Sequence, residues 1–250
     1  MSRYKLRANY DIENIDSQKM DGTVIVDVPM LSNGELNYGL SHIKKKLYEE
    51  NVYPSEIGFD IMSLATMVYM ADTRIERVVH GQDSWTREIE LEIPVSNVEI
   101  WDSQIRTVER MLKFLTGDLW KITLSSRAWQ FNNLEEVREK SNKYDEVSLF
   151  SGGMDSLIST INLMENKKNT LLISHAGEGL TKNAQKNIVN KFDLLYPDVL
   201  HTWLDLWMVF PRDYIPAGGN DNNTRSRSFL FIGYALFAMT GMDNINELLV

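Results

Sequence analysis

The sequence predicts an α/β protein, in which a parallel sheet with covering helices is preceded by a smaller α+β N-terminal domain. Three observations carry this prediction. Short apolar runs alternate with amphipathic helical patterns from residue 144 to residue 250, an order typical of a parallel sheet. A glycine-containing loop, residues 151–156, follows the first of these runs. Before residue 143, strand-like segments alternate apolar and polar residues, as in a sheet with one face in water. We therefore predict domains at 1–143 and 144–250.

In the N-terminal domain, two strands and two helices stand out. Val24, Val26 and Val28 alternate with their neighbours, and apolar residues at 89, 91 and 93 alternate with glutamates, which predicts two strands. Apolar residues at 57, 61, 64 and 68, and again at 105, 108, 112 and 115, predict helices. We expect Asp102 to cap the second helix and Gly117 to end it. No catalytic motif is recognised between residues 1 and 121, and the polar run 132–145 predicts a solvated helix or a linker.

The C-terminal domain alternates strand and helix. The pattern predicts strands at 146–150, 170–174, 199–206 and 245–250, and helices at 156–165, 184–195 and 229–239. The last predicted strand has no helix after it. Domains of this type usually continue, so we expect the C-terminal part of the fold to lie beyond Val250.

The composition excludes several kinds of site. The chain has 250 residues, of which 43% are apolar, enough for a packed core. Its net charge is −9, so duplex nucleic acid is not an expected partner. The absence of cysteine excludes a thiol nucleophile and a Cys-ligated zinc site within this chain. We find no signal peptide, and the longest apolar stretch, 229–239, is shorter than the about 20 residues of a membrane span. A cytoplasmic protein without membrane contact is expected.

The loop Ser151-Gly152-Gly153-Met154-Asp155-Ser156 is the motif that carries chemistry. It lies between the first predicted parallel strand and the helix that follows, where ligands bind in open α/β sheets. Glycines let backbone amides approach an anion, the start of a helix supplies free N–H groups, and the two serines add hydroxyl donors. The pattern therefore predicts a phosphate-binding loop. The alternative is a plain glycine turn, although five fixed positions arise by chance only about four times in ten thousand chains of this length.

The loop is not a Walker A motif, because the lysine of that motif is absent. Asp155 instead places a carboxylate beside the anion, which is repulsive unless a cation bridges the two. We therefore expect Mg²⁺ near Asp155.

Further candidates lie outside the loop. Arg225 and Arg227 precede an apolar helix, where cations oppose the helix dipole unless an anion binds there; the alternative is two solvated arginines. Lys182 follows Gly177-Glu178-Gly179 and is a candidate phosphate contact, with a surface lysine as the alternative. Ser174 and His175 end the second parallel strand and are candidates for the adenine or substrate side. The polar loop 218–223 is expected to be either a lid or a plain crossing.

Ser-Gly-Gly-x-Asp-Ser after a strand resembles the signature of the PP-loop, or N-type, ATP pyrophosphatases. Thr224-Arg225-Ser226-Arg227-Ser228-Phe229-Leu230-Phe231 is similar to the 7-cyano-7-deazaguanine synthase (QueC-like) branch. Asp72, the run Trp85-Thr86-Arg87, Pro94-Val95 and the run Leu115–Trp120 look like the extra N-terminal region of QueC-like proteins in the antiphage Qat and CBASS cassettes. The synthase proper has a four-cysteine zinc site, which this chain cannot form.

The resemblance implies an adenine nucleotide alpha hydrolase-like fold and an ATP-dependent ligase. Such an enzyme adenylates a carboxylate and transfers the resulting acyl group to an amine. By resemblance, the carboxylate is 7-carboxy-7-deazaguanine, and the catalytic residues are Asp155, Arg225 and Arg227. The implied cofactors are ATP and Mg²⁺. The amine is ammonia or belongs to a protein or another macromolecule, and the N-terminal domain is expected to recognise that acceptor or a defence partner. Two alternatives stay open: a nucleotide-binding sensor or assembly subunit without turnover, and a tRNA-modifying adenylating enzyme.

Overall fold

The computed structural model describes residues 3–131, 142–175, 179–208, 210–222, 225–243, 245 and 247–250. The chain forms two compact units, neither of which is continuous in sequence. Unit 1 comprises Met1–Tyr38, Phe59–Leu134 and Phe210–Leu230, and unit 2 comprises Gly39–Gly58, Glu135–Val209 and Phe231–Val250. This division differs from the predicted boundary at residue 143. Segment 39–58 precedes that boundary but belongs to unit 2, and segment 210–230 follows it but belongs to unit 1.

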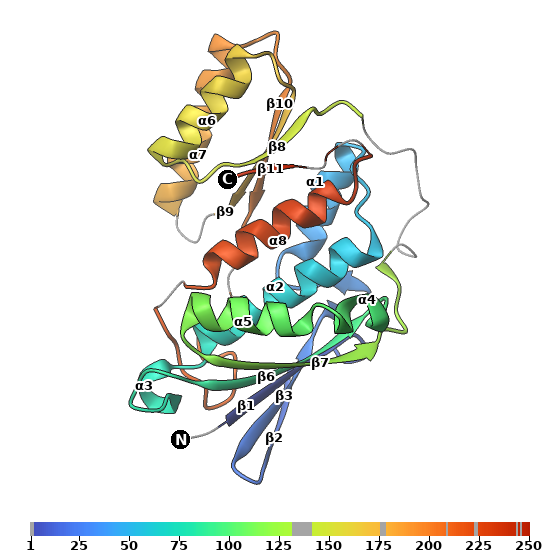
Figure 1. The fold of residues 1–250 in the computed structure, drawn as a ribbon, viewed down its shortest axis with the longest axis vertical. Helices are drawn as coiled ribbons and strands as arrows, with labels where there is room; N and C mark the ends of the chain where they lie inside the picture. Colours follow the sequence, from blue (N-terminus) through green and yellow to red (C-terminus); the bar gives the residue numbers. More distant parts are fainter. Residues whose placement is uncertain are drawn as a thin grey trace. The chain divides into compact units, whose positions relative to one another are not determined.

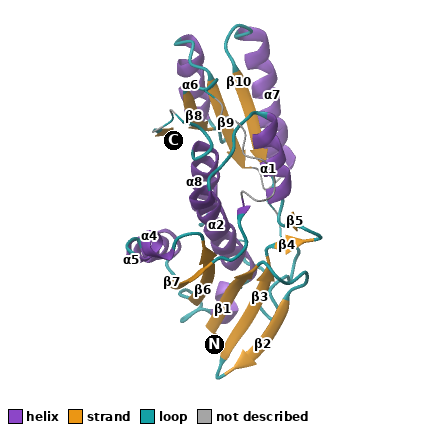
Figure 2. Ribbon diagram, turned by 90° about the vertical axis from the view of Figure 1, so that its right-hand side faces the viewer, coloured by secondary structure: helices purple, strands orange, loops and turns teal. Residues whose placement is uncertain are grey.

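Unit 1 is built on a five-stranded sheet of order β2-β3-β1-β6-β7 (Figure 2). The pairs β1–β3, β1–β6 and β6–β7 are parallel, and only β2–β3 is antiparallel. The sheet is therefore mixed and mostly parallel, which differs from the α+β arrangement expected for the N-terminal part. The strands of this unit are β1 (Arg3–Asn9), β2 (Asp16–Met20), β3 (Thr23–Pro29), β4 (Leu31–Ser32), β5 (Glu35–Leu36), β6 (Glu88–Val95) and β7 (Leu119–Ser126).

One face of this sheet forms the core of unit 1. The register places Leu6 beside Val26 on one side and beside Leu91 on the other, and all three are fully buried. The opposite face carries charges: Lys5 pairs with Glu90 and Glu92 at N–O distances of 3.3 and 3.0 Å. This confirms the predicted strands and their half-exposed character. Alternation fixes which side chains share a face but not the direction of the partner strand, so it could not distinguish a parallel from an antiparallel sheet.

The helices of unit 1 include both of those predicted from spacing. The second ends at Gly117, whose φ of +77° and N–H bond to the Lys113 carbonyl form a left-handed cap, as predicted. Asp102 as its N-cap is wrong: Asp102 ends the preceding short helix, and Gln104 stands at the cap position. The helices are α2 (Glu56–Arg74), α3 (Arg77–His80), α4 (Val98–Asp102) and α5 (Ile105–Thr116), and the unit boundary passes through α2.

Unit 2 contains a four-stranded sheet of order β10-β9-β8-β11 in which every pair is parallel. Helix α6 connects β8 to β9 and helix α7 connects β9 to β10 (Figure 1). The predicted strand–helix alternation is thus confirmed. The elements of unit 2 are α1 (Leu40–Glu49), β8 (Glu146–Leu149), α6 (Met154–Glu165), β9 (Thr170–His175), α7 (Gly179–Leu195), β10 (His201–Leu206) and β11 (Leu248–Leu249). Helix α8 (Arg227–Met239) is divided between the units after Leu230.

Strand β9 of unit 2 is buried along its whole length, as expected for a parallel strand covered on both faces. Helices α6 and α7 share one hydrophobic cluster with the strands; its buried members are Phe150, Leu172, Val189 and Phe192, and Leu157, Ile161, Ile188, Tyr196 and Trp203 pack against them. The strand order reverses at β8, with β9 on one side and β11 on the other. Such a reversal is the position at which open α/β sheets bind ligands.

Residues 132–141 of the polar run 132–145 lie outside the described residues. The same holds for Gly177 and Glu178, and for Asn223 and Thr224.

Candidate functional site: the loop after strand β8

The loop predicted to bind phosphate leaves the sheet at the carboxyl end of β8 and leads into α6. Gly152 has a φ of +82°, and Gly153 is the N-cap of α6 with an extended backbone. No side chain caps this helix at Gly153. The first-turn N–H groups of a helix have no intrahelical acceptor, so this end of α6 presents amide donors and the positive end of the helix dipole.

A left-handed residue is needed at position 152, and the space around it is small. A Cβ at Gly152 would lie 2.9 Å from Cγ of Gln185, a fully buried residue of α7. Gln185 also holds the loop directly, because its Nε2 donates to the Ser151 carbonyl oxygen at 2.9 Å. The loop conformation is therefore fixed by a contact with the neighbouring helix, 34 residues away in sequence.

The two serines organise the loop from within. Their hydroxyls lie 3.1 Å apart, and Ser156 Oγ accepts from the Gly152 amide at 3.2 Å. Ser151 Oγ accepts from the Gly153 amide, also at 3.2 Å. Ser156 is half-buried, and its hydroxyl donates to the Gly153 carbonyl at 3.0 Å, whereas Ser151 is exposed and within reach of a ligand in solvent. The structure thus brings the six predicted loop residues together around the first turn of α6.

Met154 and Asp155 are the first two residues of α6, and both are exposed. An acidic residue in the first turn is compatible with the helix dipole. Across the described ranges, no three His, Asp or Glu side chains come together in a way that would hold a metal ion. Mg²⁺ commonly binds through one or two carboxylates together with the phosphates of a substrate. Asp155 therefore fits a cation that arrives with a nucleotide, and does not fit a cage built by the protein.

Ser174 and His175 end β9, beside β8, and both are buried. Ser174 Oγ accepts from Trp203 Nε1 at 2.9 Å and donates to the Phe150 carbonyl. It therefore links three segments at the carboxyl edge of the sheet. A direct contact of either residue with adenine or a substrate stays a prediction.

Lys182, in the first turn of α7, forms an ion pair that the sequence did not suggest. Its partner is Asp205 near the end of β10, which also binds Lys46 from α1. Asp205 is only 5% exposed. Burial opposes its ionisation, but the hydrogen bonds from Lys182 and Lys46 outweigh this effect and lower the pKa of the Asp205 carboxyl. Lys46 lies 159 residues from Asp205 in sequence, so no local pattern indicates the pair.

The two arginine candidates belong to unit 1. Arg225 Nη1 donates to the Thr116 carbonyl at 2.8 Å, and its guanidinium lies 4.4 Å from the centroid of the Trp85 ring. Arg227 is the first residue of α8 and is half-buried. Their role as phosphate ligands stays a prediction, and part of the hydrogen-bonding capacity of Arg225 is already used within its own unit.

A buried ion network in unit 1 is the largest feature that motif analysis missed. Asp118 accepts from Arg77 Nη1 at 2.7 Å and from Arg87 Nη2 at 2.6 Å, and Arg87 also reaches Asp72 at 2.6 Å. Asp72 in turn accepts from the amide and the hydroxyl of Ser226, at 2.9 and 2.8 Å. Segment 210–230 is thereby tied to the N-terminal part of the chain.

Burial alone would favour a neutral Asp118, but Arg87 and Arg77 outweigh it and lower the pKa of the carboxyl. Burial likewise disfavours charged Arg87, and its hydrogen bonds to Asp118 raise its pKa overall. Asp72, Arg87 and Asp118 are among the residues on which the resemblance of the N-terminal region was based. The structure gives them a shared role in holding unit 1 together.

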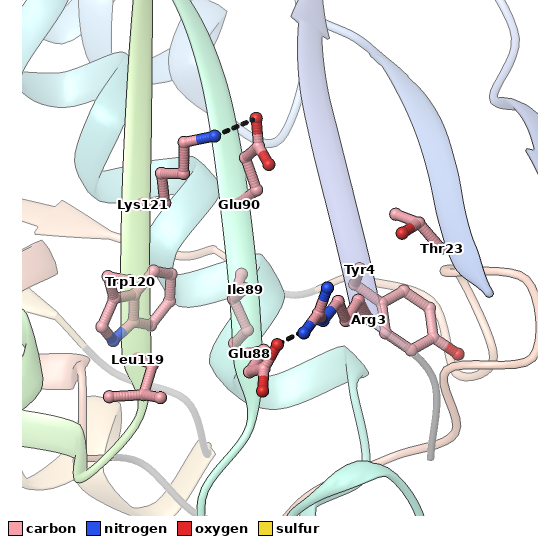
Figure 3. A pocket seen from close by; sticks show the side chains of 9 residues that line it. All are labelled: Arg3, Tyr4, Thr23, Glu88, Ile89, Glu90, Leu119, Trp120 and Lys121. Carbon is pink, nitrogen blue, oxygen red and sulfur yellow. Dashed lines mark ion pairs between the residues drawn. The ribbon is translucent and has the colours of Figure 1, made fainter. Parts of the chain in front are cut away.

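Unit 1 also has an open pocket of about 330 Å³ at the amino ends of β1, β3, β6 and β7 (Figure 3). Its charged side chains face one another in pairs: Arg3 pairs with Glu88, and Lys121 lies 3.6 Å from Glu90. Ligands of parallel sheets bind at the opposite, carboxyl ends of the strands. The paired charges fit a solvated sheet face, so we assign no function to this pocket.

Comparison of the chain with protein-family models, curated proteins and solved structures gave no match. The resemblance to PP-loop enzymes therefore stays a prediction based on the residues themselves. None of the helices in the described part of the chain has the length and apolar character needed to cross a membrane.

Proposed function

We propose that the protein is an ATP-dependent ligase that adenylates a carboxylate and transfers the acyl group to an amine. The observation that carries the proposal is the position of the loop 151–156: it follows the strand at which the order of a parallel sheet reverses, and it opens a helix whose first turn carries no side-chain cap. The sequence resemblance to PP-loop enzymes supports the choice of ATP as the ligand and of adenylation as the reaction.

In the proposed reaction, a carboxylate oxygen of the substrate attacks the α-phosphorus of ATP. The bond from that phosphorus to the bridging oxygen breaks, and pyrophosphate leaves. An amine then attacks the acyl carbon, AMP leaves with the electron pair of the C–O bond, and the nitrogen releases one proton to solvent. The resemblance suggests 7-carboxy-7-deazaguanine as the carboxylate, and a protein amine in antiphage defence as one acceptor.

The chain's own residues bind and orient the phosphates in this scheme. The amides at the start of α6 and the hydroxyl of Ser151 donate to phosphate oxygens. Ser156 orders the loop through its bonds to Gly152 and Gly153, and the loop is further preorganised by its bond to Gln185. Lys182 offsets part of the negative charge. Mg²⁺ enters as the counter-ion of ATP, beside Asp155. By resemblance, Arg225 and Arg227 stabilise the charge that develops on the phosphates.

The test is pyrophosphate release from MgATP in the presence of candidate carboxylates, 7-carboxy-7-deazaguanine among them. We expect wild type to release pyrophosphate and Asp155→Asn to lose at least about tenfold in rate, because a carboxylate that supports the cation is replaced by an amide of the same shape. Asp198→Asn is the matched control: this exposed aspartate precedes β10, at the amino edge of the same sheet.

Equal pyrophosphate release by wild type and Asp155→Asn would contradict the proposed role of the loop. Tight ATP binding with no pyrophosphate release for any carboxylate would instead favour the nucleotide-binding sensor. Binding of tRNA that weakens steeply with salt would favour the tRNA-modifying enzyme.

A further inference from the structure

A pair of lysines shares one buried carboxylate at the carboxyl edge of the unit 2 sheet. Lys46 binds Oδ1 of Asp205 and Lys182 binds Oδ2. The Asp205 side chain is 6% exposed, whereas those of Lys46 and Lys182 are 26% and 40% exposed. The three side chains together carry a net charge of +1, and the two lysines are partly exposed to solvent.

Among the described residues, Asp205 is the carboxylate that pairs with each of the two lysines. Lys182 lies in the first turn of α7, where the helix dipole disfavours a cation. Its Nζ lies 5.6 Å from the centroid of the Trp207 ring, which is 41% exposed. Tyr234 Oη is buried without a hydrogen-bond partner among the described residues, and Asp205 adds to the effect of burial in raising the pKa of this phenol. A bound anion would compensate the two lysines.

Helix α7 links the lysine pair to the loop 151–156. Gln185, which donates to the Ser151 carbonyl, is on the same helix as Lys182 and three residues after it. Side chains three residues apart lie on one face of a helix, and they point back toward its N-terminus. Lys182 is therefore one turn nearer the carboxyl edge of the sheet than the residue that holds the loop.

We infer that Lys46 and Lys182, held in place by Asp205, bind the polyphosphate chain of the nucleotide whose phosphates contact the loop 151–156. This inference rests on the proposed function, and adds to it a second cation and a positioning residue that the loop motif does not contain. An ammonium group has three donors, and Asp205 takes up one on each lysine. The remaining donors are available to phosphate oxygens.

The experiment measures MgATP and AMP affinities by calorimetry for the full chain. We expect Lys46→Met and Lys182→Met each to weaken ATP binding by about tenfold, the loss expected for one charge-assisted hydrogen bond, and to change AMP binding less. Lys191→Met is the matched control, because Lys191 is exposed on the same helix and lies nine residues, about two and a half turns, from Lys182.

Asp205→Asn separates positioning from simple electrostatics, because the two predict opposite signs. Removal of a negative charge beside an anion site would by itself tighten ATP binding. If Asp205 positions the lysines, its replacement releases them and ATP binding weakens. Thermal unfolding and circular dichroism verify that the variant is folded; if it is not, the two lysine variants decide the proposal.

Each outcome is decisive. Weaker ATP binding by both lysine variants and by Asp205→Asn, with Lys191→Met unchanged, supports the inference. If Gly152→Ala abolishes ATP binding but both lysine variants bind ATP within twofold of wild type, the inference is wrong and the proposed role of the loop still stands. Tighter binding by Asp205→Asn overturns the positioning role. A wild-type protein that does not bind ATP overturns both this inference and the proposed function.

Discussion

Replacement of Gly152 by alanine tests whether the loop after β8 needs its observed conformation. The backbone at this position has a φ of +82°, and a left-handed conformation costs an L-residue about 1–2 kcal/mol. The added Cβ would also meet Gln185 Cγ at 2.9 Å. If Gln185 moves away, its bond to the Ser151 carbonyl is lost, which costs about 0.5–1.5 kcal/mol.

Alanine also restricts the unfolded chain, which offsets about 0.4–1 kcal/mol of this cost. We therefore expect Gly152→Ala to lower the free energy of unfolding by about 0.5–3 kcal/mol and to weaken ATP binding. Chemical denaturation followed by circular dichroism measures the first effect, and calorimetry the second.

Gly34→Ala is the matched control. Gly34 has a φ of +78°, close to that of Gly152, but nothing lies within 4 Å of its added Cβ. It therefore reports the backbone strain alone, and its destabilisation should be smaller than that of Gly152→Ala. The reasoning is refuted if Gly152→Ala is as stable as wild type and binds ATP equally well.

The remaining predictions concern buried charges. Asp118→Asn should destabilise the protein by about 3–5 kcal/mol, because it leaves the two buried guanidinium groups of Arg77 and Arg87 to share the carboxylate of Asp72. Glu92→Gln, which removes a partly exposed partner of Lys5, should cost at most about 1 kcal/mol. Equal melting temperatures for these two variants would contradict the assignment. Stability should also fall as the pH drops below about 4: the pKa values of Asp118 and Asp205 are lowered in the folded state, so their contribution is complete above the unfolded value of 3.8 and is lost as the pH falls through the folded values. Denaturation curves between pH 7 and pH 2 measure this dependence, and a midpoint that is constant over the acidic range would show that neither carboxylate is linked to folding.

Local patterns in the sequence predicted part of the secondary structure and the position of the candidate loop. Alternation of apolar and polar residues predicted β3 and β6, and helical spacing predicted α5 with its end at Gly117. The strand–loop–helix order placed residues 151–156 at the end of β8. These features depend on neighbours within a few residues, which is why they are visible without a structure.

Tertiary structure decided what depends on residues far apart in the chain. The partners of Asp205 come from α1 and α7, and those of Asp72 lie 15 and 154 residues away, at Arg87 and Ser226. A charged residue looks the same in a sequence whether it is solvated or buried with a partner, and only burial makes the pair matter energetically. The return of segment 210–230 to unit 1 follows from the same contacts. The sequence alone therefore located the loop and named Lys182 as a candidate, whereas the fold joined Lys182 to Lys46 through Asp205.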